Sequence, residues 1–186
     1  MSTQTKFILF IVGIIVLVGG IGFFVSRDPG KFDEFAKKLT DGGAKFYGAF
    51  WCSHCQAQKK EFGSSQKYLP YVECSNTDNS PKQVCLDDKI EGYPTWSFGN
   101  GIRLTSDKEP TVCPVVKEGE RGEGICLDRG SNFYPVYLFD GFGFSIKSEL
   151  GPVKAGNIWQ FAGGAQAVGE VPLQFLADQI GYTLPQ

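Results

Sequence analysis

The sequence predicts an α/β domain that follows an N-terminal membrane-spanning helix. Residues 7–25 form an uncharged apolar run that is long enough to cross a bilayer as one helix. The segment 45–50 is short, apolar and aromatic, as a buried strand would be, and the polar run after it can continue as a helix until Gly63. Pro172 opens a last helix with apolar residues on one face.

The apolar run at 7–25 is expected to stay as an anchor, with residues 1–6 in the cytoplasm and 26–31 as a linker. A cleaved signal peptide is the alternative, but the run exceeds a usual signal core and no A-x-A-like site follows it. The basic residues on its two sides say little about orientation. The chain has six cysteines, and an even number in an exported domain suggests disulfides. The domain at 32–186 is therefore expected at the cell membrane, single-pass, on the extracytoplasmic side.

Length and charge limit the classes of function. The chain has 186 residues and a formal net charge of −2, and the residues after the anchor suffice for one domain with a real core and an elaboration. Because the sequence carries no basic stripe, nucleic acid is not an expected partner.

The first elements of the domain follow from spacing. Phe32, Phe35, Ala36 and Leu39 repeat at helical intervals, which predicts an amphipathic helix that packs on the sheet. Gly42-Gly43 ends that pattern before the strand at 45–50 begins.

Trp51-Cys52-Ser53-His54-Cys55 stands between that strand and the next helix. Unpaired N–H groups at a helix N-terminus would stabilise a Cys52 thiolate, the form that attacks disulfides. Cys55, about one turn later, is placed to resolve a mixed disulfide, and His54 can add a positive charge beside Cys52. A zinc site would need further ligands, but the other cysteines stand singly and His54 is the one histidine, so no metal is expected. A plain structural disulfide remains an alternative.

Two further strands and one helix follow the C-x-x-C motif. Segment 71–74 predicts a short strand, and Ser80 and Gln83 form a capping box that predicts a helix over 81–90. Segment 95–98 predicts the next strand after a turn at Tyr93-Pro94.

Cys74 and Cys85 flank a polar loop. A disulfide that closes this loop would stabilise the fold by about 2–3 kcal/mol on the chain-entropy model. A structural role is favoured for this pair, and a second redox pair is the alternative.

The second half of the chain begins with Asn100-Gly101, a hairpin turn signal. Cys113 and Cys126 bracket a polar, charged segment that burial could not hold folded, so a 113–126 bridge is expected. A β-hairpin is predicted from strands 134–139 and 142–145, with Asp140-Gly141 as a type I′ turn. Its aromatic side chains are expected in the core, and an exposed surface beside the C-x-x-C motif is the alternative.

The last predicted elements are a strand and a helix. Ile158–Phe161 predicts the final strand, which Gly163-Gly164 ends. The helix after Pro172 has four apolar side chains on one face and is closed by Gly181. These four are Leu173, Leu176, Ala177 and Ile180.

Two motifs carry a resemblance to a known family. Phe50-Trp-Cys-Ser-His-Cys55 resembles the active site of the thioredoxin superfamily, and Glu91-Gly-Tyr-Pro-Thr-Trp96 resembles its cis-proline loop. With the Tyr-Val-Glu-Cys run at 71–74, they look most like the thioredoxin-like domain associated with bacterial vitamin K epoxide reductase homologues. The resemblance covers about residues 32–101 and 157–182. It implies a thioredoxin fold, a central mixed sheet flanked by helices, with an insertion at about 102–156 before the last strand.

The resemblance also implies roles for residues at the site. Cys52 and Cys55 would be catalytic, and Tyr93-Pro94 would be a cis bond beside Cys52, with the Tyr93 backbone pairing with substrate. It adds weight to a redox relay through a second cysteine pair. No cofactor is expected in the domain. The supporting residues are Trp51, Ser53, His54, Tyr93 and Pro94. The structural or secondary redox cysteines are Cys74, Cys85, Cys113 and Cys126.

Two departures from thioredoxin favour an oxidant. Phe46 stands where thioredoxins usually carry a buried carboxylate. Ser53-His54 is closer to the Pro-His dipeptide of DsbA-type oxidases, and a stabilised Cys52 thiolate makes the pair more oxidising. We therefore expect disulfide donation to thiol-containing exported proteins. The resemblance suggests reoxidation by a quinone-linked membrane partner that is vitamin K epoxide reductase-like or DsbB-like. The alternatives are a reductase or isomerase, for example in cytochrome maturation, and a non-catalytic binding module.

Overall fold

The computed structural model describes residue 4 and residues 11–14, 30–112, 136–139 and 142–186. The chain divides into two compact units, Met1–Gly30 and Lys31–Gln186. Residues 11–14 are helical, and most of the span expected at 7–25 lies outside the described residues. In the part of the chain that the structure describes, no helix has the length and apolar character to cross a membrane.

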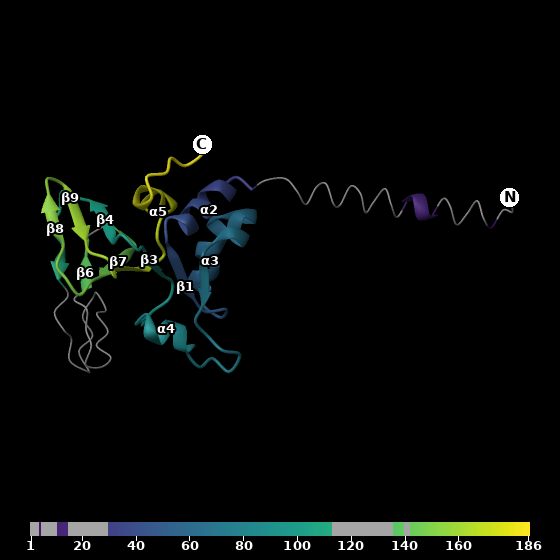
Figure 1. Cartoon of the computed structure of the whole chain (residues 1–186), viewed down its shortest axis with the longest axis horizontal. Helices are drawn as coiled ribbons and strands as arrows, with labels where there is room; N and C mark the ends of the chain where they lie inside the picture. Colours follow the sequence, from purple (N-terminus) through teal and green to yellow (C-terminus); the bar gives the residue numbers. More distant parts are fainter. Residues whose placement is uncertain (1–3, 5–10, 15–29, 113–135, 140–141) are drawn as a thin grey trace. The chain divides into compact units, whose positions relative to one another are not determined.

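The second unit is a mixed α/β domain built on a seven-stranded sheet (Figure 1). The strand order is β2 (Tyr71–Glu73), β1 (Lys45–Gly48), β3 (Thr95–Ser97), β10 (Gln166–Gly169), β7 (Phe144–Lys147), β6 (Val136–Leu138) and β5 (Thr111–Val112). β1 and β2 are parallel, and the other neighbours are antiparallel. The predicted central mixed sheet is therefore confirmed and agrees with a thioredoxin-like fold.

Three of the helices begin and end close to their predicted limits. α2 (Asp33–Asp41) buries Phe35, Ala36 and Leu39 completely, as their spacing predicts. α3 (Ser53–Glu61) leads into a 3₁₀-helix, η1 (Gly63–Tyr68). α5 (Leu173–Gln179) follows Pro172. Figure 1 shows α2 and α3 beside β1, so the helix that carries the C-x-x-C motif rests on the central sheet.

The helix predicted over 81–90 is shorter than expected, because its capping box does not form. α4 (Gln83–Asp87) has Lys82 at its N-cap position, without a side-chain cap. The amide and the hydroxyl of Ser80 both donate to Asp78 Oδ1, at 3.0 and 2.6 Å. Because Asp78 already holds Ser80 in a turn, the Ser80 side chain does not cap the helix.

A second sheet corrects two predictions about the second half of the chain. It has three strands in the order β4 (Ile102–Thr105), β9 (Ile158–Phe161) and β8 (Val153–Ala155). β4 pairs with β9 and not with β3, so Asn100-Gly101 makes a turn between sheets and no hairpin. Ile158–Phe161 is likewise not the last strand of the central sheet; that strand is β10, which the sequence pattern does not predict.

Gly101 makes the passage between the two sheets possible. Its φ is +82°, and its amide donates to the Phe98 carbonyl at 3.0 Å. A Cβ at this position would lie 2.0 Å from the Phe161 carbonyl oxygen. Glycine is therefore required both for the backbone conformation and for the close approach of β9.

The predicted hairpin is confirmed as β6 and β7, with Val136 opposite Lys147 and Tyr137 opposite Ile146. β7 begins at Phe144, two residues later than predicted, and the turn at Asp140-Gly141 lies outside the described residues. Cys113 and Cys126 also lie outside them. The hairpin aromatics Tyr137, Phe139 and Phe144 are buried, so the core prediction for them is confirmed.

Candidate active site

The C-x-x-C motif caps the N-terminus of α3. Cys52 is the N-cap residue, and its amide donates to the Ala49 carbonyl at 3.0 Å. The Cys55 amide points at Cys52 Sγ, 3.1 Å away. The Cys55 amide at the helix N-terminus therefore faces Cys52 Sγ, and negative charge on this sulfur would be stabilised there.

Cys52 and Cys55 form a disulfide, with their Cα atoms 5.3 Å apart. Cys55 is fully buried, whereas 6% of Cys52 is exposed. Beneath them, a Cβ at Gly48 would lie 2.9 Å from Cys55 Sγ and 2.9 Å from Tyr71 Cε2. Glycine thus makes room for the inner sulfur, and Cys52 is the sulfur that an incoming thiolate can approach.

The loop before β3 faces the C-x-x-C motif. The Tyr93–Pro94 peptide bond is cis, as the resemblance implies. The rings of Trp51 and Tyr93 meet edge to face with centroids 6.0 Å apart. Trp51 Nε1 donates to Ser75 Oγ at 2.9 Å, and the Pro94 carbonyl accepts from the Gly169 amide at 2.9 Å. The ring contact places Tyr93 beside Trp51 of the motif, and the Gly169 amide ties the adjoining Pro94 to β10.

Glu73 ties the active-site loop to β2, a role that the sequence pattern does not predict. Its Oε1 accepts from the amides of Phe50 and Ser75, at 3.1 and 3.0 Å. Its Oε2 accepts from the Tyr71 hydroxyl at 3.0 Å. The signal present in the sequence was a carboxylate at the end of β2. Glu73 lies opposite Gly48, the last residue of β1, and is therefore close to the loop that follows β1.

Glu170 supplies a second carboxylate near the motif, and this carboxylate contacts His54. His54 Nδ1 lies 2.5 Å from Glu170 Oε1, in a pair whose side chains are largely exposed. Gln58, fully buried on α3, accepts from the Val171 amide at 2.7 Å and donates to the Val171 carbonyl at 3.0 Å. Gln58 therefore fixes the chain before α5 against α3 and holds Glu170 in reach of His54. No local pattern in the sequence pairs positions so far apart.

Burial changes the acidity of several groups near the motif. It raises the pKa of Tyr71 well above its usual range, and it raises the pKa of Glu61 with help from the nearby Glu170 charge. It lowers the pKa of Lys59, whose Nζ lies 3.2 Å from the Tyr71 ring centroid. Phe46 is fully buried and stacks on Trp96 with centroids 4.6 Å apart. An aromatic pair thus occupies the place where thioredoxins usually carry a carboxylate.

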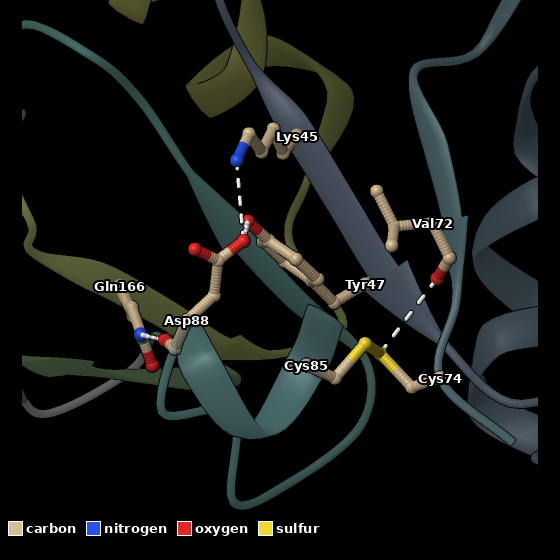
Figure 2. A network of polar contacts seen from close by, with 7 residues as sticks. All are labelled: Lys45, Tyr47, Val72, Cys74, Cys85, Asp88 and Gln166. Carbon is tan, nitrogen blue, oxygen red and sulfur yellow. Dashed lines mark hydrogen bonds and ion pairs between the residues drawn. A yellow bond between two sulfur atoms is a disulfide. The ribbon is translucent and has the colours of Figure 1, made fainter. Parts of the chain in front are cut away.

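The second disulfide, Cys74–Cys85, forms as predicted and lies in a separate buried cluster (Figure 2). The exposed fractions of Cys74 and Cys85 are 0% and 1%. Cys74 Sγ lies 3.8 Å from the Val72 carbonyl oxygen, a contact only, since a disulfide sulfur carries no hydrogen. Tyr47 and Ile90 complete the buried cluster.

Asp88 joins the end of α4 to two central strands (Figure 2). Its Oδ2 accepts from the Tyr47 hydroxyl at 2.5 Å and from Lys45 Nζ at 3.1 Å. Its backbone carbonyl accepts from Gln166 Nε2 at 3.0 Å. The Tyr47 hydrogen bond and Lys45 lower the pKa of Asp88.

The predicted residues thus separate into two groups. One group gathers around the C-x-x-C disulfide: Trp51, Cys52, Ser53, His54, Cys55, Tyr93 and Pro94. The other is the Cys74–Cys85 pair in its own cluster. Cys113 and Cys126 belong to the segment outside the described residues.

Known proteins resemble part of the chain. The chain is 52% identical over 73 residues to thiol-disulfide oxidoreductase LTO1 of Arabidopsis thaliana, covering 36% of this chain and 19% of that protein. It is 39% identical over 83 residues to a thioredoxin domain-containing protein 5 homolog of Drosophila melanogaster, covering 38% and 19%. No protein-family model matches the chain. The chain spans about a fifth of the length of these curated relatives, and the likeness supports a thioredoxin-like superfamily and a redox function for the C-x-x-C pair.

Proposed function

We propose that this chain is a membrane-anchored, extracytoplasmic thiol–disulfide oxidoreductase that donates the Cys52–Cys55 disulfide to exported proteins. The observation that carries the proposal is a disulfide at a helix N-terminus with one approachable sulfur and a cis-proline loop beside it. The names of the two relatives support the same chemistry.

The exchange proceeds in two displacements. A substrate thiolate attacks Cys52 Sγ, a bond forms between these two sulfurs, and the bond to Cys55 Sγ breaks with its electron pair. A second substrate thiolate then attacks the substrate sulfur of the mixed disulfide and releases the Cys52 thiolate. The substrate gains a disulfide and loses two electrons, which the Cys52–Cys55 pair takes up as a dithiol.

The direction of transfer rests on stabilisation of the reduced form. The Cys55 amide aimed at Cys52 Sγ and the N-terminal end of the α3 dipole favour the Cys52 thiolate, which is also the leaving group of the second displacement. Phe46 in place of a buried carboxylate further argues against an efficient general reductase. Both features favour an oxidant over a reductase or isomerase.

The membrane parts of the proposal rest on the sequence. The apolar run at 7–25 supports the anchor, and the even number of cysteines supports an oxidising compartment. A quinone-linked membrane protein, vitamin K epoxide reductase-like or DsbB-like, would reoxidise the pair. The resemblance to domains associated with such proteins is the support for this partner.

Trapping of mixed disulfides tests the function. In Cys55→Ser no thiol at position 55 can attack Cys52 Sγ in the mixed disulfide and expel the bound protein, so Cys52 should retain substrate proteins in complexes that dithiothreitol dissolves. The matched control is Cys52→Ser/Cys55→Ser, which should retain none. Exported proteins recovered with the single variant alone support the proposal. An equal yield from both variants, or no complex from either, would contradict catalysis on proteins and favour the non-catalytic binding module.

A further inference from the structure

Opening of the active-site disulfide leaves a charge on a buried atom. Cys55 is fully buried, and it leaves the disulfide as a thiolate. An unpaired charge in such a place is costly, so a proton delivered to Cys55 Sγ would stabilise the opened state. Phe46, on the strand below, is an aromatic residue packed on Trp96 and supplies no proton.

Lys59 lies on the same face of α3 as Cys55, because the two residues are four positions apart in one helix. Its Nζ sits over the ring of Tyr71, 3.2 Å from the centroid. The edge of that ring and Cys55 Sγ lie together beside Gly48, each 2.9 Å from the position of a Cβ there. The Tyr71 ring therefore has the Lys59 amine over its face, and its edge lies near Cys55 Sγ.

The phenol of Tyr71 and the carboxylate of Glu73, the groups nearest to the Lys59 amine, are engaged in hydrogen bonds of their own. The Tyr71 hydroxyl donates to Glu73 at 3.0 Å, and burial raises the pKa of Tyr71, so the phenol keeps its proton. Both oxygens of Glu73 are already occupied, because they accept from two backbone amides and the phenol. Lys60 is exposed beside Lys59. Burial lowers the pKa of Lys59 against the opposing charge of Glu73, so this ammonium gives up a proton more readily than a solvated lysine.

We propose that Lys59 donates a proton to the Cys55 thiolate when the disulfide opens and takes that proton back when the disulfide forms again. The proposal rests on the proposed function of the Cys52–Cys55 pair. The attacking dithiol supplies the two electrons, and the N–H bond of the Lys59 ammonium breaks as the S–H bond of Cys55 forms. The amine is left neutral, and in this form it can take the proton of Cys55 when the disulfide forms again. The flexible four-carbon side chain carries the amine from the face of Tyr71 to the sulfur.

The test compares three variants of the full chain, Lys59→Met, Lys59→Arg and the control Lys60→Met. Excess dithiothreitol reduces each protein, and stopped-flow tryptophan fluorescence follows the opening, since Trp51 adjoins the disulfide. Arginine keeps a charge over Tyr71 but holds its proton at any ordinary pH. Both Lys59 variants should therefore open about tenfold or more slowly near neutral pH, while Lys60→Met keeps the unmodified rate. The difference in opening rate between the Lys59 variants and the unmodified chain should shrink as pH rises, because a deprotonated Lys59 has no proton to donate to Cys55.

Each other outcome is informative. A normal rate in Lys59→Arg would show that charge alone suffices, and a normal rate in Lys59→Met would show that Lys59 is not needed; both overturn the proposal. A difference in opening rate that stays constant with pH would indicate a structural role for Lys59 and would also overturn the proposal. Trapping by Cys55→Ser decides the function separately, so loss of trapping counts against the function and equal opening rates count against Lys59.

A measurement on the unmodified chain covers the case in which the variants do not fold. The ¹³Cε signal of Lys59 is followed by NMR through a pH titration of the oxidised and of the reduced protein. The reduced protein should show a second inflection that coincides with the titration of Cys55, and the oxidised protein should not. A single inflection in both forms would contradict proton exchange between the two groups.

Discussion

The active-site disulfide and the Cys74–Cys85 disulfide differ in what surrounds their sulfurs. Cys52 and Cys55 are three residues apart at a helix N-terminus, and Cys52 keeps some exposure. Cys74 and Cys85 are eleven residues apart, both buried, and packed with Tyr47. The first pair can be attacked at one sulfur, whereas the second offers no sulfur to an incoming thiolate in the folded state.

The polar side chains near the two disulfides also differ in whether they contact the segment that carries the cysteines. Around the C-x-x-C motif, Glu73 and Glu170 hold the loop and His54 at the surface. Around the second pair, Asp88 joins α4 to β1 and β10, away from the sulfurs. The position of the sulfurs relative to solvent and to the helix N-terminus, and not the disulfide bond itself, therefore separates the two roles.

The largest difference is expected in reduction potential. Equilibration of the full chain in glutathione buffers, followed by alkylation and peptide mass analysis, gives a value for each pair. Cys52–Cys55 should lie towards DsbA, about −120 mV, and Cys74–Cys85 below about −300 mV, as structural disulfides do. A Cys52–Cys55 value near thioredoxin's, about −270 mV, would reverse the proposed direction and indicate a reductase. Similar potentials for the two pairs would revive a relay between them.

The second expected difference is in stability. Removal of Cys74–Cys85 by a double change to alanine should lower the free energy of unfolding by about 2–3 kcal/mol, because a longer loop is freed in the unfolded chain. The matched variant Cys52→Ala/Cys55→Ala frees a shorter loop and should lose less. Urea unfolding of both variants measures the difference. A larger loss of unfolding free energy on removal of the Cys52–Cys55 pair would contradict the assignment of Cys74–Cys85 as the structural disulfide.

Local signals explain why much of this fold was predictable. Helical spacing marks α2 and α5, an aromatic run marks β1, and the motif Trp51–Cys55 marks the start of α3. The cis bond at Tyr93 was predicted by resemblance alone, since the residues themselves indicate only a turn there.

The missed strand shows where local signals fail. Ile158–Phe161 alternates and carries large side chains, yet it belongs to the second sheet. β10 has small residues, and its Ala167 lies opposite Trp96 on one side and Ile146 on the other. A small side chain fits between such neighbours, but it gives a weak strand signal. In the same way, Glu170 and Gln58 act through contacts between distant positions that no spacing rule reveals.

The smallest expected effect concerns the network that holds α4. Tyr47→Phe removes the hydrogen bond to Asp88 and should cost about 1 kcal/mol of unfolding free energy at neutral pH. It should leave disulfide exchange at Cys52 unchanged, because Tyr47 belongs to the separate cluster around Cys74 and Cys85.

The pH dependence of this variant has a definite sign. The folded state holds the pKa of Asp88 below its usual value of 3.8, with the Tyr47 hydrogen bond as the main cause. The unfolded chain therefore takes up the proton first, so the contribution of Asp88 is present above that value and is lost as pH falls through the folded pKa. Without the Tyr47 hydroxyl, the Asp88 carboxylate contributes less stability, so the variant loses less stability in acid. The urea midpoints of the variant and the unmodified chain should therefore converge between pH 7 and about pH 3. A difference in urea midpoints that stays constant over this range would mean that Tyr47 stabilises α4 through packing. The carboxylate of Asp88 would then contribute nothing to the stability of the region around the Cys74–Cys85 disulfide.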